Sequence, residues 1–245
     1  MEKKELRSAV LRYLARAYRC DAAELEEERL LFTLEDTCRE PCLKMMAFER
    51  CVVVLSSAPL ADRVKELLSG RSRDEIFECP FVYGQTIHYV PDLSRLSESD
   101  LPDAYAPELL VGAEVCRMRG IRGFENALAF DKEGFTPTVI ACLARSGGEV
   151  VAVAGAAREA EDVWEVGVDV RADHRRGGLG VSLVRRLTAE IVRRGVAPVY
   201  SASVTNIASQ RVALRSGYAP CWVDTYGNTL ADGAPYPEIT GRLRL

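Results

Sequence analysis

A glycine-rich turn that carries two arginines is the segment whose residue types and spacing point most directly to chemistry. Arg175, Gly178 and Gly180 follow the spacing R-x-x-G-x-G, directly after an alternating apolar run at 164–170 that predicts a strand. An amphipathic stretch follows at once and predicts a helix. Glycines let successive backbone N–H groups converge, a helix start adds unpaired donors, and arginines supply charge for phosphate. This succession favours a site for a phosphate-bearing ligand.

Two better-known phosphate-binding turns do not fit this segment. No Gly-Lys-Ser/Thr follows the glycines, so the turn is not a Walker loop. Its glycine spacing and its late position in the chain also differ from the dinucleotide-binding fingerprint, which belongs to an opening βαβ unit. A glycine-rich turn that makes only a tight connection stays open as the alternative at this point.

The segments after the turn narrow the choice. A strand is predicted at 197–204, and the next helix starts at Asn206, whose side chain suits an N-cap, and stops at Gly217. The order of strand, R-x-x-G-x-G turn, helix, strand, Asn-led helix and Gly-Tyr pair resembles the GNAT superfamily of acyl-CoA-dependent N-acyltransferases. The resemblance covers about residues 135–225.

The resemblance implies an α/β fold with a mixed, mostly antiparallel sheet flanked by helices, and acetyl-CoA as the co-substrate. In that family the turn holds the pyrophosphate of coenzyme A, and the strand before it splays from the next strand and pairs with the pantetheine arm. Two later polar residues match family positions beside the far end of the cofactor. The cofactor-binding residues implied in this sequence are Val168, Val170, Arg175, Arg176, Gly177, Gly178, Leu179, Gly180, Asn206 and Ser209.

Two carboxylates on the predicted strand are the candidate catalytic residues. Glu165 and Asp169 share one face of that strand with Gly167, because side chains alternate along a strand. Either carboxylate could bind or deprotonate an attacking amine. The alternative is that one faces solvent and the other caps the following turn.

The general acid of many GNAT relatives is missing from its usual place. Those relatives carry a tyrosine seven positions after the asparagine, where it protonates the departing thiolate, and this sequence has Ala213 there. Tyr200, Tyr218 and Tyr226 are near in sequence. Because a thiolate leaves readily near neutral pH, we expect no single tyrosine to be essential as the acid.

Charge is distributed unevenly along the chain. The net charge of −4 disfavours nucleic acid as a partner. Between residues 171 and 215, however, nine arginines stand against two acidic residues, and this is the segment expected to receive a polyanionic cofactor. A solvated helix face explains four of these arginines equally well, Arg185, Arg186, Arg193 and Arg194.

Composition indicates the compartment. The eight cysteines are scattered and only two histidines accompany them, so we expect small core residues rather than disulfides, and no metal site. No apolar run approaches the roughly 20 residues that cross a bilayer, and the first residues lack a signal-peptide core. These features predict a cytoplasmic protein without a membrane partner.

The sequence predicts two domains, a small α/β N-terminal domain of unassigned role at 1–84 and a GNAT-like acyltransferase domain at 85–245. The first part reads as a helix, an extended segment that turns at Glu49-Arg50, and a second helix. The second part reads as a strand, helical segments, and a hairpin that turns at 146–148. The predicted bounds are 3–19, 44–55, 60–68, 87–90, 98–119, 138–144 and 150–156.

These observations together predict an enzyme that transfers an acetyl group from acetyl-CoA to a primary amine of a small molecule or peptide. A non-catalytic acyl-CoA-binding regulatory or sensor module is the rival, favoured by Ala213 and by the absence of a recognisable motif in the first domain. The identity of the amine, the acyl length and the oligomeric state, a homodimer included, stay open.

Overall fold

The chain forms two compact units. The structure, a computed structural model, describes residues 1–37, 42–79, 82, 84–96 and 101–225. The larger unit comprises Met1–Val10 and His88–Pro220, and the smaller unit comprises Leu11–Ile87 and the chain from Cys221. The chain passes from one unit to the other within α1 (Lys3–Ala17), β4 (Thr86–Pro91) and β10 (Tyr218–Asp224). The domain boundary expected at 84/85 stays a prediction.

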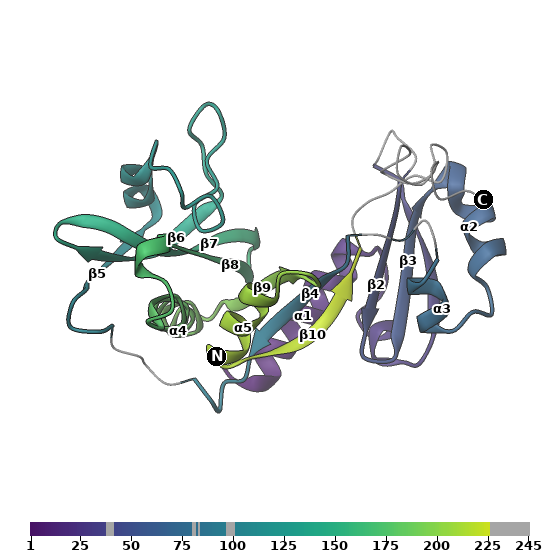
Figure 1. The fold of residues 1–245 in the computed structure, drawn as a ribbon. Coiled ribbons are helices and arrows are strands. Elements are labelled where there is room, and N and C mark those ends of the chain that lie inside the picture. Colours follow the sequence, from purple (N-terminus) through teal and green to yellow (C-terminus); the bar gives the residue numbers. More distant parts are fainter. Residues whose placement is uncertain (38–41, 80–81, 83, 97–100, 226–245) are drawn as a thin grey trace. The chain divides into compact units, whose positions relative to one another are not determined.

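The larger unit is built on a mixed sheet with the strand order β4-β9-β8-β7-β6-β5 (Figure 1). Neighbouring strands from β5 to β8 run antiparallel, whereas β8 and β9 run parallel. The prediction of a mixed, mostly antiparallel sheet flanked by helices is therefore confirmed. The further strands are β5 (Ala106–Val111), β6 (Thr138–Ser146), β7 (Glu149–Ala160), β8 (Val163–Val170) and β9 (Ala197–Ser203).

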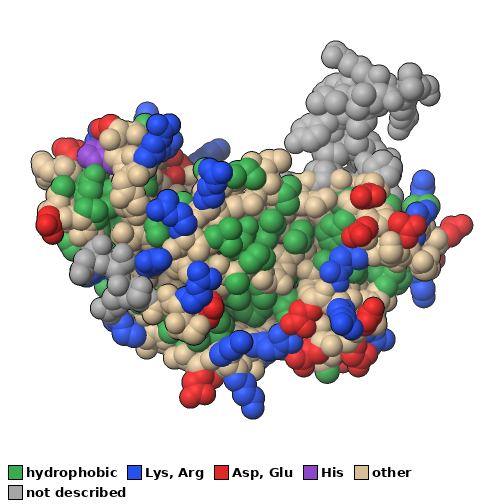
Figure 2. Space-filling view, turned by 60° about the horizontal axis from the view of Figure 1, so that its bottom comes forward, with side chains coloured by type: hydrophobic (Ala, Val, Ile, Leu, Met, Phe, Trp, Pro, Cys, Tyr) green, Lys and Arg blue, Asp and Glu red, His purple; other side chains and the backbone are tan. Residues whose placement is uncertain are grey.

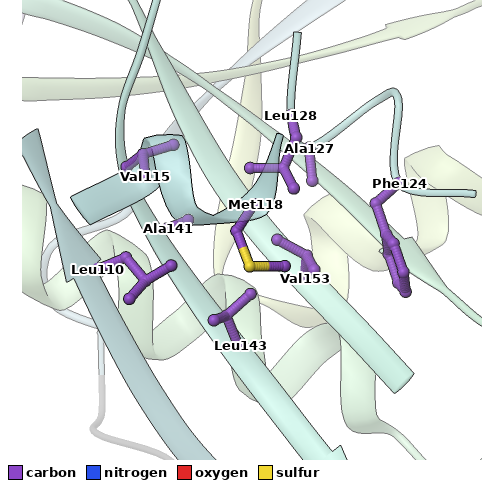
Figure 3. Close-up of a cluster of buried hydrophobic side chains, with 9 residues drawn as sticks. All are labelled: Leu110, Val115, Met118, Phe124, Ala127, Leu128, Ala141, Leu143 and Val153. Carbon is purple, nitrogen blue, oxygen red and sulfur yellow. The ribbon is translucent and has the colours of Figure 1, made fainter. Parts of the chain in front are cut away.

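Both faces of this sheet are covered. The helix α4 (Leu179–Arg193) packs on β6 to β9 along one face and buries the apolar side chains of its inward stripe, among them Leu183, Leu187 and Ile191. The helix α5 (Ile207–Arg215) follows β9 and also contacts α4. The 3-10 helix η2 (Gly112–Met118) and the chain after it cover β5, β6 and β7 with a buried apolar cluster (Figure 3). Because both faces are covered, the middle of β7 is apolar without alternation.

The smaller unit contains a second layered arrangement. Its strands follow the order β1-β3-β2-β10, where β1 is Leu30–Glu35, β2 is Leu43–Phe48 and β3 is Cys51–Ser57. The helices α2 (Ala58–Leu68) and α3 (Arg73–Phe77) cover one face, and a buried cluster that includes Val54, Val64 and Ile76 joins them to the strands. The short 3-10 helix η1 spans Glu24–Glu26.

Most elements expected from the sequence are present, but one is wrong. The segment 98–119 was expected to be helical, and Ala106–Val111 is instead the strand β5, while residues 97–100 lie outside the described residues. β5 is the last strand in the order of the sheet, where Pro107 needs no inter-strand partner for its missing N–H. The sequence analysis also missed β1.

Candidate functional site

The parallel strands β8 and β9 separate before either of them ends. Their paired register runs from Val163 and Ala197 to Val166 and Tyr200, whereas β8 continues to Val170 and β9 to Ser203. On its other edge β8 stays paired with β7 as far as Val170. Beyond Val166 and Tyr200 the facing edges of β8 and β9 are therefore not paired with each other, and we refer to this splay between the last residues of the two strands as the cleft.

The backbone of β8 has a defined direction at this cleft. The N–H of Arg171 donates to Val151 O on β7 at 2.9 Å, so the backbone groups of Arg171, and of Asp169 two residues before it, point towards β7. Successive residues of a strand direct their N–H and C=O groups to opposite edges. Val168 and Val170 therefore direct their backbone groups to the side where β9 has separated.

The glycine-rich turn lies at the end of this strand. Arg176 and Gly178 both have left-handed backbone conformations, with φ of +72° and +81°, and Gly178 is the N-cap of α4. A left-handed conformation costs a non-glycine residue such as Arg176 about 1–3 kcal/mol. The first intrahelical bond of α4 runs from Ser182 N–H to Gly178 O, so the N–H groups of the preceding helical residues point out of the helix start.

The surroundings of the glycines suit a close approach to the backbone. A Cβ added to Gly178 would meet no described atom within 4 Å, so this side of the turn is open. A Cβ added to Gly180 would lie 3.2 Å from Val170 Cγ2, which shows how closely α4 starts against β8. Arg175 is exposed, and its Nε donates to Val170 O at 2.8 Å, so its guanidinium is held at the junction of strand and turn.

The start of α5 supplies hydroxyl and amide groups. Asn206 caps the helix, as expected, because its side chain accepts a hydrogen bond from Ser209 N–H at 3.1 Å. The Ser209 hydroxyl lies 2.8 Å from the Tyr200 hydroxyl on β9. Burial raises the pKa of Tyr200, which keeps its phenol protonated.

The position that holds tyrosine in many GNAT relatives is filled here by a buried methyl group, because Ala213 is fully buried on α5. Of the three tyrosines near it in sequence, Tyr226 lies outside the described residues. Tyr218 is buried, its hydroxyl is 2.7 Å from that of Thr188, and burial raises its pKa. Tyr200 and Tyr218 also meet edge to face, with ring centroids 5.9 Å apart.

The two predicted carboxylates differ in what they contact. Glu165 is half-buried on β8 and accepts a hydrogen bond from the Ser201 hydroxyl on β9, which spans the point where the two strands separate. Asp169 accepts three hydrogen bonds from the chain at Asn126 and Ala127. The catalytic roles of both carboxylates stay predictions, and the contacts of Asp169 favour a structural task for it.

Several residues of this site had no signal in the sequence. Ser201 appears in the sequence only as a member of a predicted strand, and Tyr200 only as a tyrosine near Ala213. Their partners, Glu165 and Ser209, are defined by the folded structure. Tyr105 was not singled out either, although its hydroxyl lies 3.1 Å from His174 Nδ1, immediately before the turn. Contacts between residues so distant in sequence have no local pattern.

Several basic side chains on α4 have partners on α4 itself or on α5. Figure 2, in which the side of α4 comes forward, shows Lys and Arg side chains spread over the surface of the larger unit. Arg193 and Arg194 pair with Glu190 on the same helix, as a solvated helix face predicts. Arg185 instead donates to Arg215 O at 2.7 Å and ties α4 to the end of α5.

Neither a metal centre nor a membrane span is found in the described part of the chain. Among residues 1–37, 42–79, 82, 84–96 and 101–225, no group of His, Cys, Asp and Glu side chains could hold a metal ion. None of the helices described there is long and apolar enough to cross a bilayer.

Comparisons with known proteins gave one matching family model and several similar solved structures. Residues 108–218 match the model of the acetyltransferase (GNAT) family. A GCN5-related N-acetyltransferase-like protein from Streptococcus suis is 17% identical, with a TM-score of 0.45, over 72% of this chain and 71% of that chain. A GCN5-related N-acetyltransferase from Kribbella flavida is 25% identical, with a TM-score of 0.42, over 61% of this chain and only 60% of that chain. Comparison with curated proteins gave no match.

Proposed function

Residues 108–218 form a GNAT acetyltransferase domain, and on that premise we propose that the protein transfers an acetyl group from acetyl-CoA to a primary amine. The observation that carries the proposal is the cleft between β8 and β9, which ends at a helix start preceded by the R-x-x-G-x-G turn. Strand backbone, anion-binding turn and carboxylate meet there within one unit.

The residues around the cleft fit acetyl-CoA. The outward N–H groups at Gly178, Leu179 and Gly180, together with the positive end of the α4 dipole, suit a pyrophosphate. Arg175 and Arg176 are exposed beside them and supply full positive charge. The backbone groups of Val168 and Val170 face the cleft, where an extended amide-bearing arm would pair as a strand does.

The chemistry requires an amine that has lost its proton and a donor for the oxygen of the thioester carbonyl. We assign the first task to Glu165, which Ser201 holds at the separation of the strands, directly or through one water. A backbone N–H that faces the cleft, such as that of Val168, serves the second task. The bond from the amine nitrogen to the acetyl carbon forms and the carbon–sulfur bond breaks. The nitrogen releases its extra proton to solvent, and coenzyme A leaves as a thiolate that takes up a proton from solvent.

The acceptor in this proposal is a small-molecule or peptide amine. The seven described cysteines are free thiols, which supports a reducing compartment such as the cytoplasm.

Ala213 favours a second candidate, a module that binds acyl-CoA without turning it over. The buried methyl group of Ala213 cannot donate a proton, so this position supplies no general acid. One experiment separates the candidates: free thiol is measured after acetyl-CoA is mixed with a panel of primary amines. Amine-dependent thiol release supports the enzyme, and tight binding of acetyl-CoA without release supports the sensor. Neither binding nor release would contradict both.

A further inference from the structure

A loop at 124–128 crosses β7 and β8 on the face opposite α4, and a carboxylate of β8 fastens it there. We propose that Asp169 is a positioning residue: it clamps the 124–128 loop over β8 so that the loop forms a wall of the amine-binding side of the cleft. This inference rests on the proposed function, because it gives a role to the second carboxylate on the face of β8 that carries Glu165.

Two facing glycines make room for the loop. Gly155 of β7 and Gly167 of β8 are paired in register. A Cβ on Gly155 would lie 1.9 Å from Ala127 O, and a Cβ on Gly167 would lie 1.8 Å from Asn126 O. Real Cβ atoms do not approach backbone so closely, so only a pair of glycines lets the loop backbone rest directly on the strands.

Asp169 lies two residues beyond Gly167 on the same face and holds the loop against the two glycines. Its Oδ2 accepts hydrogen bonds from Asn126 N–H at 2.8 Å and Ala127 N–H at 3.0 Å. Its Oδ1 accepts a third from Asn126 Nδ2 at 2.6 Å. A carboxylate oriented by three donors from one loop is well suited to positioning and poorly suited to the removal of a proton from an amine.

The apolar side of the loop is anchored independently. Phe124, Ala127 and Leu128 are buried, and Figure 3 shows them gathered with Met118 and with side chains of the sheet such as Val153. The loop is therefore attached by packing at its ends and by the carboxylate at its centre. Loss of the carboxylate should loosen the centre without unfolding the unit.

The position of the clamp links the loop to the reacting groups. Glu165, Gly167 and Asp169 alternate with valines whose side chains contact Gly180 of α4, so the clamp and Glu165 share the face away from α4. The loop backbone rests on Gly167, which lies between Glu165 and Asp169 on that same face of β8. A displaced loop would therefore change the amine side of the cleft and spare the turn that is proposed to hold acetyl-CoA.

The test compares Asp169→Ala with Asp169→Asn in the full-length protein. Alanine removes all three acceptors, whereas asparagine can keep them if the amide of Asn126 turns over, because one amide then accepts where the other donates. We expect Asp169→Ala to raise the KM for the amine at least about tenfold, since small displacements near the chemistry are costly. In Asp169→Asn the KM for the amine should rise by less than about tenfold, because the hydrogen bonds to the loop remain but are no longer strengthened by a charge. The KM for acetyl-CoA should change little in both variants.

Hydrogen exchange supplies a readout that needs no turnover. The N–H of Asn126 should exchange faster in Asp169→Ala and stay protected in Asp169→Asn. Glu149→Gln, which removes one exposed carboxylate at the start of β7, is the control for charge and should change neither exchange nor KM.

Two results would overturn the clamp. One is unchanged exchange at Asn126 in Asp169→Ala. The other is an equal loss of kcat in both variants while the loop stays protected from exchange, which would identify Asp169 as the base. If the wild-type protein turns over no amine, the proposed function fails, while the exchange comparison still decides whether Asp169 holds the loop.

Discussion

The hydrogen-bond partners of a carboxylate indicate which chemical role it can take. Glu165 and Asp169 are the same kind of group on the same face of the same strand, two positions from a shared glycine. One is held by a single hydroxyl at the point where the strands separate, and the other is occupied by three donors from a loop. These contacts are the basis for our proposal that Glu165 acts as the base and Asp169 as a positioning residue.

Replacement of Glu165 by glutamine should remove the base without a change in shape. We expect kcat to fall by at least ~10²-fold, the lower range for a positioned general base. The measurement is kcat at saturating amine and acetyl-CoA, with Ser201→Ala as the companion variant, which should lose less because it keeps the carboxylate. A Glu165→Gln enzyme with the wild-type kcat would assign the proton transfer to another group.

The tyrosines make a separate prediction at the residue scale. Tyr200→Phe and Tyr218→Phe should each cost less than ~10²-fold in kcat, because a thiolate of pKa about 8.5 leaves without a positioned acid. Tyr218→Phe should also lower the free energy of unfolding by about 1 kcal/mol, since the hydroxyl bonded to Thr188 is buried. A larger loss of kcat in one folded variant, with acetyl-CoA affinity intact, would identify that tyrosine as the acid.

At the scale of elements, we propose that the turn between β8 and α4 is the place where the phosphates of acetyl-CoA approach the protein. A valine at Gly178 would place a branched side chain in the open side of the turn, and a valine at Gly180 would press on Val170 of β8. We expect either change to abolish binding of acetyl-CoA by calorimetry while the protein stays folded by circular dichroism.

A control variant separates the effect of backbone strain from the loss of the proposed phosphate site. Gly148, in the β6–β7 hairpin, has φ +89° and equally open surroundings, so Gly148→Val imposes a comparable strain away from the cleft. It should bind acetyl-CoA as the wild type does. If Gly178→Val were folded and still bound acetyl-CoA with wild-type affinity, the phosphate site would lie elsewhere.

How far an element could be predicted depends on whether its signal is local. α4 (Leu179–Arg193) and the hairpin between β6 and β7 follow from periodicity and turn residues that lie within a few positions of one another. The strand β5 was not predicted, because Pro107 suggests a break in regular structure. A proline is tolerated there because β5 is the last strand of the sheet, a position that is defined only once the strands are assembled. The edge position overrides the local signal.

The candidate site divides in the same way. The R-x-x-G-x-G turn and the cap by Asn206 are local patterns, and the structure places both at helix starts. The packing of the 124–128 loop against Gly155 and Gly167 brings together three separate segments of the sequence. In the sequence alone, each glycine indicates only an interruption of a strand. Such contacts depend on register, which a single sequence specifies only through the complete sheet.

At the scale of the whole molecule, the proposed binding of acetyl-CoA involves only one of the two units. Every residue proposed to bind acetyl-CoA belongs to the larger unit, whereas α2, α3 and the strands β1 to β3 belong to the smaller one. We propose that acetyl-CoA binds only the folded larger unit, so mass action should stabilise that unit by about 2.7 kcal/mol at a ligand concentration of 100 times Kd.

Hydrogen exchange along the chain should locate this stabilisation. With saturating acetyl-CoA, we expect slower exchange in β8, the turn and α4, and unchanged exchange in α2 and β3, because their opening is not linked to the ligand. Free adenosine 3′,5′-bisphosphate, which lacks the pyrophosphate and the pantetheine arm, is the matched ligand control and should protect the turn less. Protection confined to the smaller unit, or a melting curve unmoved by millimolar acetyl-CoA, would show that the cleft between β8 and β9 is not the site where the thioester binds.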